Sequence, residues 1–136
     1  MTVSKALGTT LKQGTTTIGK LTSISSPEKT ADTKEVTTLD VTDGYKKYIQ
    51  GLKDGGEVTV TGFFDITDTG QLALDTAFEA GTIDTYIITF PAAIDATFTF
   101  SGIVTKYAVG EANLEDPLDF EATIKVSGKP VLAVIV

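Results

Sequence analysis

Four residue types are absent from the 136-residue chain, namely cysteine, histidine, tryptophan and arginine, so all 11 basic residues are lysines. Without cysteine there can be no disulfide and no thiolate nucleophile or ligand. Without histidine a Ser-His-Asp triad cannot form, and zinc loses its commonest ligand. Without arginine the chain lacks the bidentate fork that grips phosphate and carboxylate groups. These absences exclude most catalytic designs, so we expect a protein that is not an enzyme and that holds no cofactor or metal.

Long hydrophobic runs are absent too. The longest extends from Val131 to Val136, far short of the roughly 18 residues that a bilayer-spanning helix needs. The N-terminal sequence MTVSKALGTT has no apolar signal core, so we expect synthesis in the cytoplasm and no membrane partner. The net charge of −7 and the pI of about 4.4 disfavour tight binding to nucleic acid. The length fits one domain over residues 1–136.

Threonine is abundant, with 24 residues, and β-branched side chains suit the exposed face of a pleated sheet. Several segments alternate apolar and polar residues, which is typical of half-buried strands. The pattern predicts a mostly β fold, an antiparallel sandwich or barrel flanked by one helix, with a long extended loop. Gly102 is expected to mark a bulge or a bend. The expected strands are Glu57–Phe64, Thr85–Phe90, Ala96–Val104 and Phe120–Val126, with weaker candidates at Thr16–Ser25 and Val131–Ile135.

One helix is predicted from Thr69 to Ala80. Asp68 followed three residues later by Gln71 has the spacing of a capping box, with Asp in place of Ser or Thr. Leu74, Ala77 and Phe78 fall at i, i+3 and i+4, which predicts one buried face. Gly81 is a suitable residue to end the helix.

Two neighbouring segments fit no strand. Ser25–Asp43 is polar, and it is interpreted either as a mobile surface loop or as an arm that becomes ordered against a neighbouring subunit. Asp43–Glu57 places aromatic and aliphatic residues among glycines, either to fill the chain's own core or to anchor an interface. The candidate interface residues are Lys34, Val36, Leu39, Tyr45, Tyr48, Ile49 and Leu52.

The stretch DGYKKYIQGLKDGGEVTVTGFF, from Asp43 to Phe64, resembles a segment of the major tail tube proteins of long-tailed (siphovirus-type) bacteriophages. The segments YIITFP, ATFTFSGIV and LEDPLDFEATIKVSGKP follow in matching order, so the resemblance covers nearly the whole chain. It implies a virion protein whose protomers form hexameric rings that stack into a hollow tube, through which DNA passes without specific binding. The implied partners are copies of itself and the tape measure, tail terminator and distal tail proteins.

The acidic balance fits such a tube, because acidic residues in the lumen would repel DNA phosphates. The sequence does not identify the lumen-facing residues among Asp65, Asp84, Asp95, Glu111, Glu115 and Asp119. The polar arm 25–43 is our candidate for the contact between stacked rings.

Two alternatives remain for comparison with the structure, a glycosidase and an immunoglobulin-like module, and a third is rejected on the sequence. A glycosidase could use carboxylates from Glu111, Glu115, Asp116 and Asp119, although the chain lacks tryptophan platforms. A calcium loop at Asp65–Gly70 is rejected because Thr76 occupies the closing position. A monomeric immunoglobulin-like binding or adhesion module would have a similar strand pattern. A tube from a contractile tail or a secretion machine is not distinguished from a siphovirus tube.

Overall fold

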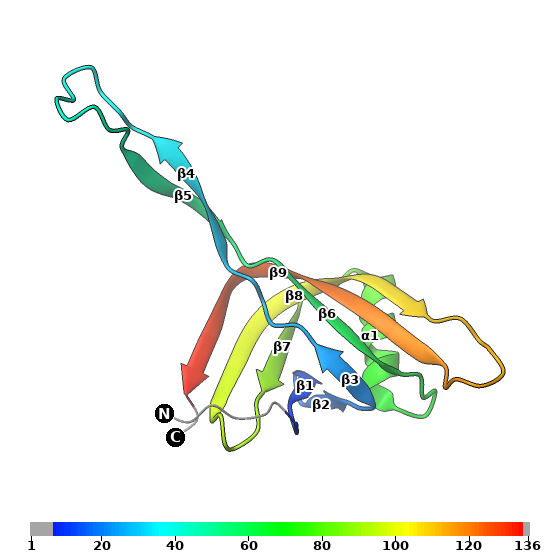
Figure 1. Cartoon of the computed structure of the whole chain (residues 1–136). Helices are drawn as coiled ribbons and strands as arrows, with labels where there is room; N and C mark the ends of the chain where they lie inside the picture. Colours follow the sequence, from blue (N-terminus) through cyan, green and yellow to red (C-terminus); the bar gives the residue numbers. More distant parts are fainter. Residues whose placement is uncertain (1–6, 135–136) are drawn as a thin grey trace.

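A computed structural model of the chain describes residues 7–134 and has one strongly curved antiparallel sheet as its centre (Figure 1). Seven strands lie in the order β2-β1-β7-β8-β9-β6-β3. The two outer strands, β2 and β3, follow each other in sequence through Gly19 and Lys20, so the sheet returns on itself as a nearly closed barrel. The strands are β1 Thr10–Gln13, β2 Thr16–Ile18, β3 Leu21–Ile24, β6 Glu57–Phe63, β7 Asp84–Thr89, β8 Ala96–Val109 and β9 Asp119–Val134.

The interior of this barrel is filled by alternate residues of the strands, as the period-two pattern predicts. Val58 and Val60 of β6 are fully buried, while Thr59 and Thr61, which alternate with them, face outward. The same alternation holds in β9 from Phe120 to Val126. The remaining core is contributed by Leu11, Ile18, Leu74, Ala77, Tyr86, Ile88, Phe98, Phe100 and Val104.

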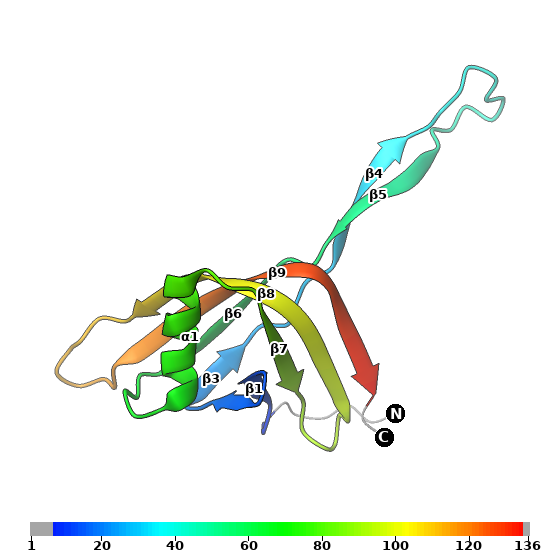
Figure 2. The same ribbon diagram turned by 180° about the vertical axis from the view of Figure 1, so that it is seen from behind.

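Helix α1, Thr69–Ala80, begins and ends where the sequence predicts, and it packs against β1, β2 and β8 (Figure 2). Asp68 accepts a hydrogen bond from the Gln71 backbone N–H, and Gly81 ends the helix in the left-handed conformation at φ 67°. The expected capping box is only half correct, because the Gln71 side chain does not turn back to Asp68. Phe78 was also expected on the buried face, but its side chain is exposed, and Gln71 is buried instead.

The fully buried Gln71 side chain ties three parts of the chain together. Its Oε1 accepts from Asp65 N at 2.9 Å, and its Nε2 donates to Phe63 O at 2.9 Å and to Gly19 O at 3.1 Å. Asp68 Oδ2 also accepts from Gly19 N at 3.0 Å. The helix N-terminus therefore holds the β2–β3 corner, which is the place where the barrel nearly closes.

Several strand predictions needed correction. Thr16–Ser25 is two strands, because Lys20 adopts a left-handed φ of 64° between them. The short strand β1 was not predicted from the sequence. The segments Phe120–Val126 and Val131–Ile135 belong to one strand as far as Val134, and Ile135 lies outside the described residues. In β8 the irregularities fall on both sides of Gly102, between Thr99 and Ser101 and between Val104 and Lys106.

A second sheet projects from the barrel as a long hairpin of β4, Thr30–Glu35, and β5, Tyr48–Asp54 (Figures 1 and 2). The polar arm 25–43 was interpreted either as a mobile loop or as an arm, and the segment after it as a glycine-rich loop. The loop interpretation is wrong for the residues that form β4 and β5. The glycines mark the irregular points of a hairpin. Gly44 lies in its turn, Gly51 lies beside the irregular pairing between Ala31 and Thr33, and Gly56 lies at its base with φ 78°.

Candidate subunit interface

All seven residues predicted for an interface lie in this one projecting hairpin, and all seven are exposed. Lys34 belongs to β4, whereas Tyr48, Ile49 and Leu52 belong to β5. Val36, Leu39 and Tyr45 lie in the segment that connects the two strands. The structure therefore brings together residues that are spread over 19 positions of the sequence, from 34 to 52.

The pairing of the two strands leaves apolar side chains on both faces of the hairpin. Lys34 is paired with Ile49, and Glu35 with Tyr48. Because successive residues of a strand point to opposite faces, Tyr48 and Ile49 lie on different sides. Every residue of β4 and β5 is exposed. An isolated two-stranded hairpin is marginally stable in water, so these faces are suited to cover by another surface.

The base of the hairpin is fixed to β9 by polar contacts. Lys125 Nζ lies 3.1 Å from Asp54 Oδ1, and the same oxygen accepts from Gly56 N at 2.8 Å. The hydrogen bond from Gly56, followed by that from Lys125, holds the pKa of the exposed Asp54 carboxyl below its usual value. A Cβ on Gly56 would lie 2.6 Å from Glu28 O, so the backbone segments also meet closely here. These contacts define the direction in which the hairpin leaves the barrel.

A second apolar surface, which the sequence analysis did not identify, lies along the last residues of β9. Val131, Leu132 and Val134 are all exposed. The register of β9 with β6 ends at the Glu57–Lys125 pair, so within residues 7–134 the later part of β9 pairs only with β8. No described strand pairs with the other edge of this part of β9, and unpaired edges favour association. The signal in the sequence was the apolar run after Pro130, which had been interpreted only as a weak strand.

The structure offers little support for the alternative functions. Glu111, Glu115, Asp116 and Asp119 are exposed around a projecting loop between β8 and β9. No group of three or more acidic residues in the described part of the chain could hold a metal ion. Among residues 7–134 no helix has the length and hydropathy to cross a membrane. The single continuous sheet also differs from the two face-packed sheets of an immunoglobulin-like sandwich.

Known proteins of the same fold occur in particles with tails or tubes. A chain from the virion of a native gene transfer agent superposes with a TM-score of 0.79 at 16% identity, over 97% of this chain and 100% of that one. A chain from the C6-symmetric tail of an empty gene transfer agent particle has a TM-score of 0.70 at 18% identity, over 87% of this chain and 85% of that one. A chain from the sheath/tube terminator structure of the extracellular contractile injection system PVC superposes with a TM-score of 0.78 at 12% identity, over 98% of this chain and 99% of that one. These likenesses establish the fold.

Sequence comparison gives the family. No curated protein sequence gives a significant match. The profile of the lambda phage tail tube protein family, however, matches residues 6–133, which is nearly the whole chain. That match agrees with the fold and with the resemblance carried by Asp43–Phe64. The chain belongs to the lambda phage tail tube protein family.

Proposed function

We propose that the protein is the structural subunit of a phage tail tube, in which hexameric rings of this chain stack into a hollow cylinder that conducts DNA to the host. Family membership makes the chain a component of a virion tail. The role is one of construction, without catalysis, and it agrees with the absence of histidine, cysteine and arginine from the sequence.

The observation that carries this proposal is the uncovered hairpin. Residues of β4 and β5 are exposed along the full length of both strands, and apolar side chains such as Tyr48, Ile49 and Leu52 lie on both faces. Exposed apolar surface of this extent is typical of protein interaction sites. We infer that the hairpin lies against a neighbouring subunit, with Lys34, Val36, Leu39, Tyr45, Tyr48, Ile49 and Leu52 at the contact.

The open edge of β9 supplies a second, different contact surface. A head-to-tail contact closes a ring only when the rotation per subunit divides a full turn. Sixfold symmetry is supported by the C6 tail of the gene transfer agent, whose chain has the same fold. Rings must then stack, and we assign that contact to the hairpin, including the polar arm 25–43.

Charge and tail architecture extend the proposal to other partners. The net charge of −7 suits a wall past which DNA slides without binding, because phosphates within about 10 Å of acidic side chains are repelled. A tube of fixed length also needs proteins that start it, measure it and end it. We therefore propose contacts with distal tail, tape measure and tail terminator proteins.

The test is assembly of the purified chain with and without its hairpin. In the variant, residues 31–53 are replaced by an Asn-Gly turn, which is the two-residue connection suited to joining the paired residues Thr30 and Asp54. Negative-stain microscopy and sedimentation over a concentration series should give tubes for the full chain and folded, non-stacking species for the variant. Thermal unfolding of both proteins verifies the barrel. Tubes from the variant at wild-type concentrations would contradict the role of the hairpin, and a full chain that stays monomeric at every concentration would contradict the function.

A further inference from the structure

We propose that the groove at the base of the hairpin binds the acidic β8–β9 loop, residues 110–118, of a second copy of this chain. The inference rests on the proposed function, because it assigns one of the contacts between tube subunits. The groove shares the base of the hairpin and part of β9 with the contacts described above, but it is a different kind of contact, because it pairs lysines with carboxylates and does not use Tyr48, Ile49 or Leu52.

The groove has a volume of about 490 Å³ and lies between the start of the hairpin and the bend of β9. Its walls are mainly apolar, and its lining includes Lys29, Lys53 and Lys129. Asp54 is the one acidic residue of the lining, and its charge is offset by Lys125 at 3.1 Å. The groove is therefore basic in a protein whose net charge is −7.

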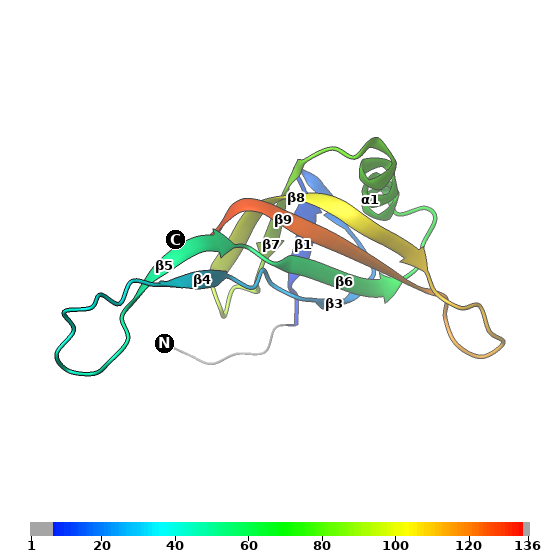
Figure 3. The same ribbon diagram turned by 90° about the horizontal axis from the view of Figure 1, so that it is seen from above.

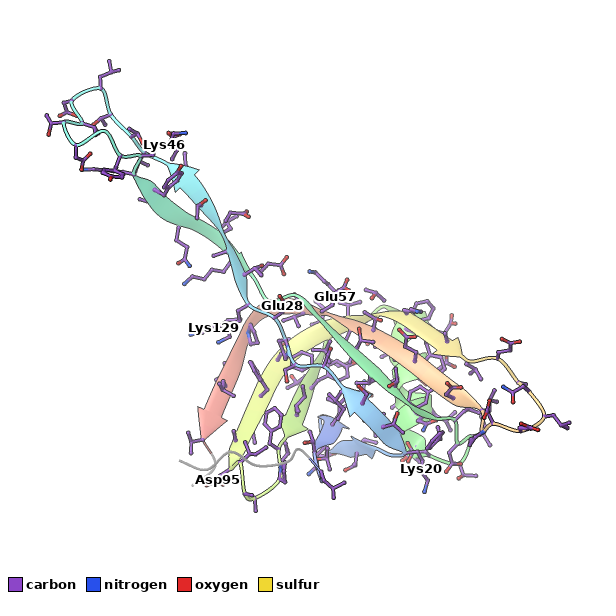
Figure 4. All side chains as sticks on the ribbon, in the orientation of Figure 1. Lys20, Glu28, Lys46, Glu57, Asp95 and Lys129 are labelled. Carbon is purple, nitrogen blue, oxygen red and sulfur yellow. The ribbon has the colours of Figure 1, made fainter. Side chains whose placement is uncertain are left out.

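The lysines of this groove are available to a partner. Lys53 and Lys129 have no ion-pair partner among the described residues, and Lys29 Nζ lies 5.7 Å from the centre of the Phe98 ring. Glu28 and Glu57 are at the same end of the hairpin (Figure 4) but do not line the groove. A ligand that combines carboxylates with a small apolar group would suit these walls.

The β8–β9 loop has that chemistry. Leu114 at its centre is 100% exposed, and it is flanked by Glu111, Glu115 and Asp116. The loop is also ordered in advance, because Asn113 Oδ1 accepts from Glu115 N at 3.1 Å and from Asp116 N at 2.8 Å. A bond from Gly110 N to Asp119 O closes its base at 2.6 Å. Binding a loop that is already shaped costs little conformational entropy.

The positions of groove and loop require two molecules. The hairpin leaves one end of the barrel and the β8–β9 loop leaves the opposite end (Figures 1 and 3), so they do not meet within one chain. The loop carries Glu111, Glu115 and Asp116 and no lysine, whereas three lysines line the groove at the other end. Unlike charges at opposite ends favour head-to-tail association, which can be repeated from copy to copy.

Charge exchange tests this pairing. The groove variant is Lys53→Glu with Lys129→Glu, and the loop variant is Glu115→Lys with Asp116→Lys. An exposed charge pair changes an equilibrium constant by up to about fivefold. Because each variant replaces two attractions by repulsions, we expect its critical concentration for tube formation to rise about tenfold or more. Mixed in equal amounts, the two variants complement each other, and the mixture should assemble within about threefold of the wild-type concentration.

The control is Lys12→Glu with Lys20→Glu, which makes the same change of net charge as the groove variant, away from the groove; Lys20 is labelled in Figure 4. It should assemble at close to the wild-type concentration. Rescue in the mixture also proves that both variants fold. If the wild-type chain forms tubes, any one of three results would overturn this pairing and leave the tube function standing. The variants could assemble at the wild-type concentration, the mixture could show no rescue, or the control could be impaired as strongly as the groove variant. A wild-type chain that forms no tubes would overturn both proposals.

Discussion

Replacing Leu52 by serine should weaken assembly without weakening the fold. Leu52 is 88% exposed in the isolated chain, so its side chain contributes little to monomer stability. We expect the free energy of unfolding of Leu52→Ser to stay within about 0.5 kcal/mol of wild type, as is usual for surface substitutions. Full burial of a leucine side chain is worth about 1.5–3 kcal/mol. If a neighbouring subunit covers Leu52, the variant loses about 2 kcal/mol per contact, which corresponds to about a 30-fold weaker association.

Sedimentation gives the critical concentration for assembly, and urea unfolding below that concentration gives monomer stability. Ile83→Ser is the matched control, because Ile83 is 60% exposed but lies outside the hairpin, between α1 and β7. We expect the control to assemble near the wild-type concentration. Equal critical concentrations for Leu52→Ser and wild type would refute the assignment of Leu52 to an interface. A large loss of monomer stability in Leu52→Ser would refute the claim that the Leu52 side chain contributes little to the stability of the monomer.

Two predictions concern the barrel. Gln71→Leu leaves the backbone groups of Gly19, Phe63 and Asp65 without their hydrogen-bond partner. We therefore expect the free energy of unfolding, measured in urea, to fall by about 2–4 kcal/mol. An unchanged free energy of unfolding would contradict the role given to this side chain. Burial, and secondarily Asp84, raise the pKa of Tyr86, whose hydroxyl has no hydrogen-bond partner among the described residues. Because the pKa of Tyr86 is higher in the folded state than in the unfolded state, the stability that the protonated hydroxyl contributes is complete below the unfolded pKa of about 10 and is lost as the pH rises above it. Phenylalanine does not ionise, so Tyr86→Phe should retain more of its stability than wild type in alkaline unfolding. The exposed control Tyr45→Phe should lose stability as wild type does; equal alkaline losses in both variants would contradict the assignment.

Strong periodicity made several elements predictable from sequence. Helix α1 was predicted from Thr69 to Ala80 because Asp68 and Gly81 carry the chemistry of its two ends. The strands around Val58, Ile88 and Phe100 were predicted because their alternation matches one buried face. The predictions were wrong where contacts between distant parts of the chain determine the position of a side chain. Gln71 has a helix-capping pattern locally, yet it is used to bind the β2–β3 corner, which no local pattern reveals.

The hairpin was the larger error, and its cause is physical. Sequence patterns identify strands by a buried face, whereas β4 and β5 bury neither face in the single chain. The polar pattern of Thr30–Glu35 and the glycines of the following segment therefore resembled loops. The choice of interface residues was nevertheless concentrated in this hairpin, because large apolar side chains in a polar surrounding remain visible in the sequence. The acidic loop and the lysines of the groove are far apart in sequence, so their complementarity emerges only from the fold.

Cryo-electron microscopy of tubes formed by the purified full chain tests the central claim most directly. The account predicts a hollow tube with sixfold symmetry, in which density from a neighbouring subunit covers Tyr48, Ile49 and Leu52 of every hairpin. Solvent-exposed hairpins on the outside of an assembled tube, or a preparation that contains only single chains up to the highest attainable concentration, would contradict it.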